Sequence, residues 1–177
     1  MSTSRKAAAP SKQPAEERLI VLLRHGIAEE ASADKKDEDR GLTKEGHARM
    51  KEIARGLAEA LPKVQVIYTS PLLRAVQTAL WVSKGYKSRL EIKTSDALAP
   101  GASAKEFRAF ADSITERRVI LVGHEPTLTR SLGALTGIDT AKLELKKGGC
   151  YGVRIAPDGN GTLEWLLTPR VLRKFGT

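Results

Sequence analysis

Two uninterrupted apolar runs restrict the fold of this chain more than any other feature. In "RLIVLL" (18–23) and "RVILVG" (118–123), every residue after the first arginine is apolar or glycine. A strand with one face in water alternates apolar and polar residues, whereas a strand covered on both faces is apolar throughout. These runs therefore predict the central strands of a mainly parallel sheet with helices on both faces.

The rest of the chain alternates between strand and helix patterns. A further strand is predicted at "VQVIYT" (64–69), and a weaker one at "RLEIKT" (89–94). Helices are predicted from Thr43 as N-cap to just before Pro62, from Ser70 and Pro71 as N-cap and first residue to about Lys84, over 103–114, and over 126–135. The segment 149–169 has two alternating runs around "PDGNG", which indicates a β-hairpin. We expect a single-domain, three-layer α/β/α fold with a mainly parallel sheet and an antiparallel C-terminal hairpin.

Composition sets the domain organisation and the kind of partner. The chain has 177 residues, enough for one domain. Residues 1–17 are rich in Ser, Lys, Ala and Pro, so we expect a disordered basic tail before a folded domain over 18–177. No apolar run is long enough to span a bilayer, so no membrane partner is expected. The net charge of +9 suggests an anionic partner: nucleic acid, an acidic protein or a phosphorylated substrate.

Cys150 is the one cysteine, so no internal disulfide is possible and a cytoplasmic location is expected. A small apolar strand residue is the simplest interpretation of this cysteine. The sequence around it lacks the loop of a cysteine phosphatase, and it forms no metal-ligand spacing with the three histidines. We therefore expect no metal and no cofactor. Walker, dinucleotide-binding and nucleophile-elbow motifs are also absent from the sequence.

Basic and imidazole side chains follow three of the predicted strands. Arg24, His25 and Gly26 follow the first run, Arg74 lies about one turn into the helix after the second strand, and His124 follows "RVILVG". Ligands of open parallel sheets bind beyond the carboxyl ends of the strands, where helix N-termini favour anions. Two guanidinium groups and two imidazoles at one sheet edge suit a dianion such as phosphate.

These residues carry a resemblance to a known family. "LLRHG", "SPLLRAVQTA" and "LVGHEP" resemble the motifs of the histidine phosphatase superfamily, in the order and spacing of that family. "RGLTKEG" and "LTPRVLR" make the chain most similar to the SixA-type phosphohistidine phosphatases. The resemblance extends from Leu19 over nearly the whole chain.

The resemblance implies a mechanism. His25 would attack phosphorus and become phosphohistidine, while Arg24 and Arg74 hold the phosphoryl oxygens and lower the pKa of His25. His124 would donate a hydrogen bond to the transferring group. Gly26 would let the backbone approach closely, and its amide would help to fix the histidine tautomer.

Two features depart from the family pattern. Arg40-Gly41-Leu42-Thr43 stands where the family often has Arg-Pro-Leu-Thr, and we expect Arg40 to support the pocket without a catalytic role. Ester-cleaving branches use an acidic proton donor, which the sequence does not single out. The candidates are Glu29, Glu30, Asp96 and Glu125, of which Glu29 and Asp96 are preferred. His47 is expected on the surface of the first helix.

Three functions stay open at this point. A metal-independent phosphatase with a phosphohistidine intermediate, acting on protein phosphohistidine, is the leading hypothesis. The alternatives are a phosphatase of small phosphoesters and a non-catalytic protein that binds phosphate or nucleic acid. The charged segments lack interleaved aromatic residues, which disfavours nucleic acid. A mutase is disfavoured because no large insertion would enclose a sugar acid.

Overall fold

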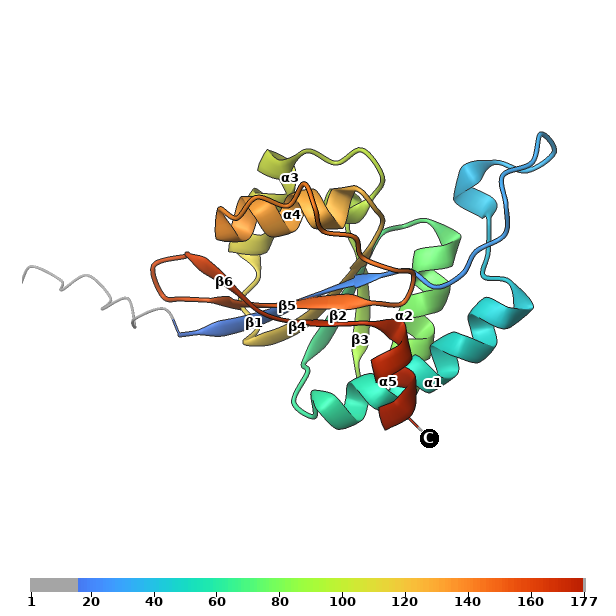
Figure 1. Cartoon of the computed structure of the whole chain (residues 1–177), viewed down its shortest axis with the longest axis horizontal. Coiled ribbons are helices and arrows are strands. Elements are labelled where there is room, and N and C mark those ends of the chain that lie inside the picture. The colour runs from blue at the N-terminus through green and yellow to red at the C-terminus, as the bar shows by residue number, and fades with distance from the viewer. Residues whose placement is uncertain (1–15, 177) are drawn as a thin grey trace, which may run out of the picture.

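The structure, a computed structural model, describes residues 16–176, which form one six-stranded sheet in the order β3-β2-β4-β1-β5-β6. The strands are β1 (Arg18–Arg24), β2 (Val66–Thr69), β3 (Glu91–Thr94), β4 (Arg118–Gly123), β5 (Cys150–Ile155) and β6 (Gly161–Leu167). The helices are α1 (Lys44–Ala60), α2 (Leu73–Gly85), α3 (Ala104–Ser113), α4 (Thr127–Thr136) and α5 (Pro169–Phe175), with short 3-10 helices η1 (Asp37–Asp39) and η2 (Asp96–Leu98). Helices α3 and α4 cover one face of the sheet, and α1, α2 and α5 cover the other (Figure 1).

The predicted fold class is confirmed. Strands β1, β2, β3 and β4 pair in parallel, while β5 runs antiparallel to β1 and β6 antiparallel to β5. The two apolar runs are β1 and β4, which lie side by side in the middle of the sheet. Alternate residues of β1 serve opposite faces, since Ile20 packs into the layer of α3 and α4 and Val21 into the layer of α1 and α2. Both faces are covered by helices, so both sets of side chains are apolar.

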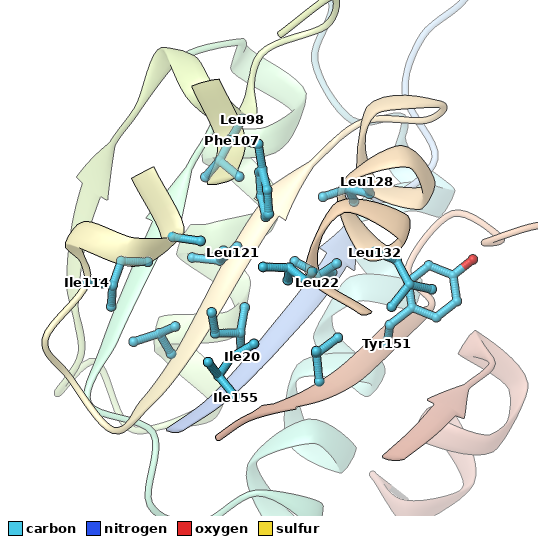
Figure 2. Packing of buried hydrophobic residues seen from close by; sticks show 14 of the residues in the cluster. Ile20, Leu22, Leu98, Phe107, Ile114, Leu121, Leu128, Leu132, Tyr151 and Ile155 are labelled. Atoms are coloured by element: carbon cyan, nitrogen blue, oxygen red, sulfur yellow. The ribbon is translucent and has the colours of Figure 1, made fainter. Parts of the chain in front are cut away.

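Figure 2 shows the core on the α3/α4 face. Leu22 of β1 lies next to Leu132 of α4, Ile20 lies further along β1 beside Ile155, and Phe107 of α3 belongs to the same core. All of these side chains are at most 1% exposed. At ~1.5–3 kcal/mol for each large buried apolar side chain, this face contributes much of the driving force that holds β1 in the sheet.

The second helix begins later than the sequence indicates. Ser70 and Pro71 are not its N-cap and first residue, because α2 begins at Leu73 with Leu72 as N-cap. The Ser70 hydroxyl accepts a hydrogen bond from the Leu72 amide (3.3 Å) and bonds His124, so it closes a turn before the helix. Arg74 is therefore the second residue of α2, in its first turn.

The C-terminal helix α5 is missing from the sequence-based prediction. Its start signals are present, since the Thr168 side chain accepts a hydrogen bond from the Val171 amide and Pro169 is the first residue. Helix α5 packs on α1, and a Cβ at Gly56 would lie 1.9 Å from the Leu172 carbonyl oxygen. Only glycine allows this close approach.

Three further expectations concern residues away from the sheet edge. The expected tail lies outside the described residues except for Glu16 and Glu17, which pair with Arg117 (3.0 Å) and Arg154 (3.5 Å). His47 is half-buried and not on the open surface, because it accepts a hydrogen bond from the Trp81 indole (2.9 Å). Among residues 16–176, no helix has the length and apolar character needed to cross a bilayer.

Candidate active site

Strand register brings the three polar strand ends together. Arg24 of β1 pairs with Gly123 of β4, and the His25 amide continues the ladder by donating to the Gly123 carbonyl (3.0 Å). On the other side of β4, the Ser70 amide donates to the Val122 carbonyl (2.9 Å). The residues that follow β1, β2 and β4 thus lie at adjacent positions on the carboxyl edge of the sheet.

His25 and His124 lie against each other at this edge. Their ring centroids are 5.0 Å apart and the planes are tilted by 53°. His25 is 7% exposed and His124 is 2% exposed, so both imidazoles are withdrawn from bulk water. The structure therefore brings the two predicted histidines into one site.

The hydrogen bond of His25 fixes its tautomer. Nδ1 lies 2.7 Å from the carbonyl oxygen of Gly26. A carbonyl can only accept, so Nδ1 carries the proton and Nε2 keeps a lone pair. We expected the Gly26 amide to help fix the tautomer, but the Gly26 carbonyl does this. The Gly26 amide instead donates to the Thr78 hydroxyl (3.1 Å).

Both imidazoles are held in the neutral form. Burial is the largest cause that lowers the pKa of His25 to about 4, and the nearby charges of Arg74, Arg24 and Lys147 act in the same direction. Burial, together with His25 and Arg74, lowers the pKa of His124 to about 3. At neutral pH the Nε2 lone pair of His25 is therefore free to attack an electrophile.

Arg74 is buried and held from two sides. Its backbone carbonyl accepts a hydrogen bond from the Thr78 hydroxyl (2.7 Å), and this hydroxyl accepts a hydrogen bond from the Gly26 amide. Its guanidinium donates to the Asp37 carbonyl oxygen (Nη1, 2.7 Å) and to the Asp37 carboxylate (Nη2, 2.9 Å). The sequence did not single out Asp37, which lies in an acidic loop where no local pattern separates it from its neighbours.

Arg24 and the segment before β5 border the same site. The Arg24 guanidinium donates to the Leu145 carbonyl (2.7 Å), and the Gly148 amide lies within hydrogen-bond distance of the Arg24 and His25 carbonyls (3.1 and 3.2 Å). Within the described residues, Nε of Arg24 is buried without a partner. That N–H is available to an oxyanion. Lys147, next to Gly148, lies close enough for its charge to act on His25.

Ser70 contacts the second histidine. Its hydroxyl oxygen is 2.8 Å from Nε2 of His124. The other ring nitrogen, Nδ1, is buried and has no hydrogen-bond partner among residues 16–176. Because buried polar atoms are nearly always paired, Nδ1 is available to an oxygen atom of a ligand at this edge.

The four carboxylate candidates have different surroundings. Glu29 is bound by Lys35 and by the Gly41 amide, which lower its pKa. Asp96 is exposed in η2, and Glu30 is exposed in the loop after β1. Glu125 differs from these, since burial raises its pKa and one of its oxygens is buried without a partner in the described chain. Only Glu125 combines proximity to His124 with an environment that favours the protonated form.

The groups at this edge suit the binding of an oxyanion and nucleophilic attack by a neutral imidazole. A neutral imidazole with a free lone pair lies beside a second imidazole and within the electrostatic influence of two guanidinium groups. No group of three His, Cys, Asp or Glu in residues 16–176 is arranged to hold a metal ion. Cys150 is buried in β5, and burial raises the pKa of its thiol to about 12, so the thiol stays protonated.

A separate cavity of about 570 Å³ lies at the amino ends of β1 and β4, at the opposite edge of the sheet. Arginine is the most frequent residue in its lining, and two of these arginines have partners that explain their presence. Arg18 donates to the Ala111 and Ile114 carbonyls at the end of α3, and Arg154 pairs with Glu164. Positive charge at a helix C-terminus is stabilising, so the contacts of Arg18 have a structural role, and Arg154 joins β5 to β6 through its ion pair.

Comparisons with known proteins agree with this geometry. The sequence profile of the histidine phosphatase superfamily (branch 1) matches residues 20–99. An uncharacterized protein of Picosynechococcus sp. is 34% identical over 139 residues, which cover 76% of this chain and 84% of that protein.

Solved structures share the fold. The protein histidine phosphatase SixA complexed with tungstate superimposes with a TM-score of 0.78 at 23% identity, covering 86% of this chain and 97% of that chain. A putative phosphohistidine phosphatase SixA from Agrobacterium tumefaciens gives 0.74 at 26% identity, over 86% and 98% of the two chains. A phosphoglycerate mutase from Bacillus anthracis gives 0.75 at 16% identity, over 93% and 99%. The fold is thus shared by proteins with different substrates.

Proposed function

The chain belongs to the histidine phosphatase superfamily, is of the SixA type and is therefore a phosphatase that works through a histidine; from this premise we propose that its substrate is phosphohistidine displayed on proteins. The observation that carries the proposal is the Nδ1–H of His25 bonded to the Gly26 carbonyl, which leaves Nε2 free beside Arg24, Arg74 and His124. Two named neighbours, SixA with tungstate and the putative SixA of Agrobacterium tumefaciens, support the substrate class.

The reaction has two steps. Nε2 of His25 attacks phosphorus, the N–P bond of the substrate breaks, and the substrate imidazole leaves with the bonding electron pair and takes up a proton. Water then attacks the phosphoryl group on Nε2, so that inorganic phosphate leaves and His25 is regenerated. Arg24 and Arg74 bind the phosphoryl oxygens, and His124 donates to them from Nδ1.

The leaving group favours phosphohistidine. An alkoxide needs a placed acid to leave, whereas imidazole has a conjugate-acid pKa of roughly 6.5 and leaves with less help. The segment 27–65 is occupied by η1 and α1, and in Figure 1 the chain after β1 projects beyond the sheet before it turns back into α1. No inserted cap domain interrupts residues 16–176, which suits a substrate displayed on a protein surface.

A second candidate function is hydrolysis of small phosphoesters, and Glu125 is the observation that favours it. Its raised pKa and unpartnered oxygen suit a general acid that protonates an alkoxide. The phosphoglycerate mutase among the structural neighbours is consistent with such a substrate class.

A turnover panel tests the substrate assignment. The specificity constants for a phosphohistidine peptide, a sugar phosphate, a nucleotide and a phosphoserine peptide are measured with the wild-type protein in the presence of a chelator. We expect the phosphohistidine peptide to be preferred. A sugar phosphate preferred by about tenfold, or ~1.4 kcal/mol in transition-state stabilisation, would make the substrate assignment wrong. Salt-dependent nucleic-acid binding without turnover would instead indicate a binding protein.

Two variants separate the chemistry from the substrate. His25→Ala should abolish turnover and the acid-labile phosphoenzyme, while His47→Ala, a half-buried histidine outside the site, should retain both. Glu125→Gln should leave phosphohistidine cleavage within about twofold of wild type while slowing alkyl phosphate cleavage by about 10²-fold or more. Equal losses on both substrates would mean that Glu125 is not a leaving-group acid.

A further inference from the structure

The loop between β1 and α1 carries one carboxylate that reaches the candidate active site. The 3-10 helix η1 consists of Asp37, Glu38 and Asp39, all on the exposed surface. Of these three, Asp37 alone contacts an arginine of the site. None of the three residues of η1 is buried, so packing does not explain the position of this segment.

Asp37 bridges two arginines. Its Oδ1 accepts from Nη1 of Arg40 (2.6 Å), and its Oδ2 accepts from Nη2 of Arg74 (2.9 Å). Its carbonyl oxygen also accepts from Nη1 of Arg74 (2.7 Å). Arg40 is tied back to the chain after β1, since its Nε donates to the Glu29 carbonyl (2.8 Å). The carboxylate is thus fixed in space on both sides.

These contacts hold one edge of the Arg74 guanidinium. A guanidinium has five N–H groups, and Asp37 occupies one on each terminal nitrogen. Arg74 has 6% side-chain exposure, whereas the Asp37 side chain has 57%. A guanidinium held along one edge cannot rotate freely, so its remaining N–H groups keep a defined direction.

We propose that Asp37 is a positioning residue that aims Arg74 at the phosphoryl group. The inference rests on the proposed function, in which Arg74 binds the phosphoryl oxygens. Asp37 itself does not touch the substrate. The negative charge of Asp37 also offsets the positive charge of Arg74. Asp37 therefore improves the orientation of the Arg74 guanidinium but weakens the attraction of the site for an anion.

This combination predicts an unusual kinetic signature. In Asp37→Asn the side chain keeps its size but loses its charge, so Arg74 becomes less restrained and the site more positive. We expect kcat to fall by about 10- to 100-fold because a misplaced catalytic contact slows the chemical step. Competitive inhibition by inorganic phosphate should stay equal or become tighter. If the substitution merely disordered the loop, the active site would instead bind phosphate more weakly.

Asp39→Asn is the matched control. It removes the same charge from the same short helix without an Arg74 contact, and it should retain wild-type kcat. Unchanged kcat in Asp37→Asn, or a rise in kcat/KM that marks Asp37 as an obstruction, would overturn the proposal. Weaker phosphate inhibition together with the fall in kcat would also overturn it.

A spectroscopic readout is independent of turnover. In ¹⁵N NMR, hindered rotation should give separate Nη resonances for Arg74 in the wild type and in Asp39→Asn. In Asp37→Ala the carboxylate contact of Nη2 is lost and only the contact of Nη1 with the residue 37 carbonyl remains, so the resonances should broaden and move together. Resonances in Asp37→Ala that stay as sharp and as separate as in the wild type would overturn the positioning role. If the wild type turned over no phosphorylated substrate, the proposed function would fail, while the resonances would still report whether Asp37 holds Arg74.

Discussion

The imidazole rings of His25 and His124 lie 5.0 Å apart between centroids, tilted by 53°, although the two residues come from distant parts of the chain. Burial is the largest cause that lowers the pKa of both rings, and the His25 ring further lowers the pKa of His124.

Neither histidine of the pair should titrate near neutral pH. The pKa of His25 is lowered to about 4 and that of His124 to about 3, in both cases mainly by burial. The ring C–H resonances of both residues, assigned with His25→Ala and His124→Ala, should stay constant from pH 8 to pH 5. A titration midpoint near 6.5 for His25 would mean that the ring is solvated and that the nucleophile is protonated in mild acid.

Stability should fall in mild acid because of the same two groups. In the unfolded chain a histidine has a pKa of roughly 6.5, so between that value and about 4 the unfolded state binds more protons than the folded state. The free energy of unfolding should therefore be at its plateau above pH 6.5 and decline as the pH falls toward 4. Urea unfolding at several pH values measures this. A His25→Asn/His124→Asn variant should show a flatter curve, and an equally steep decline in that variant would assign the effect to other groups.

Ser70→Ala should impair His124 without unfolding the protein. Oγ of Ser70 accepts from the Leu72 amide and bonds Nε2 of His124 (2.8 Å). In the proposed mechanism the hydroxyl donates its proton to Nε2, so that the imidazole proton is on Nδ1. Loss of the hydroxyl should lower kcat by about 10- to 100-fold and change the ¹⁵N signature of the His124 tautomer. Ser131→Ala removes an equally buried hydroxyl from α4 and should keep wild-type kcat. An unchanged His124 tautomer in Ser70→Ala would contradict this role.

Gly26→Ala should cost both stability and activity. A Cβ there would lie 2.6 Å from Cγ of Met50 and 3.2 Å from a methyl group of Leu42, in a region with no free space. Overpacking of this kind destabilises by about 1–3 kcal/mol, and the shift would also disturb the carbonyl that holds His25. Gly133→Ala in α4 meets only ordinary contacts at 3.5 Å, so urea unfolding should show it as neutral or stabilising. Equal stabilities of the two variants would contradict the steric argument.

Lys147 should recruit the anionic substrate. The charge of Lys147 is among those that lower the pKa of His25, and the Gly148 amide ties this segment to the carbonyls of Arg24 and His25. Lys147→Ala should raise KM by about three- to tenfold with little change in kcat, and the effect should shrink at high salt. Lys146→Ala, its exposed neighbour, is the matched control and should change KM less. If both variants changed KM equally, Lys147 would contribute no more than any other positive charge on the surface.

The fold and the histidine pair could be predicted because their signals are local. A continuous apolar run followed by a polar triplet specifies both a central strand and what stands at its end, and parallel register then brings His25 beside His124. The partners of these groups could not be predicted in the same way. Asp37 is one of several carboxylates in an exposed loop, and only the folded backbone decides which of them reaches Arg74.

Local capping rules explain two errors at helix ends. Ser70-Pro71 has the composition of a helix start, but the Ser70 hydroxyl bonds a histidine that is distant in sequence, and the helix begins at Leu73. Thr168-Pro169 does start a helix, α5, which is short and stabilised by its contact with α1 near Gly56. Tertiary contacts decide between such equivalent signals.

The sheet order has a consequence for how the protein is made. Strand β1, which ends just before His25, is flanked by β4 and β5, and both come from much later in the chain. As the chain leaves the ribosome, the nucleophile has no neighbouring strand until β4 has been made, and β1 is flanked on both sides only when the sequence past residue 155 is available. Long-range pairing of this kind makes folding slow. A product interrupted before β4 would carry the Arg24-His25-Gly26 triplet with neither His124 nor a strand beside it, so such a fragment should be inert toward phosphorylated proteins.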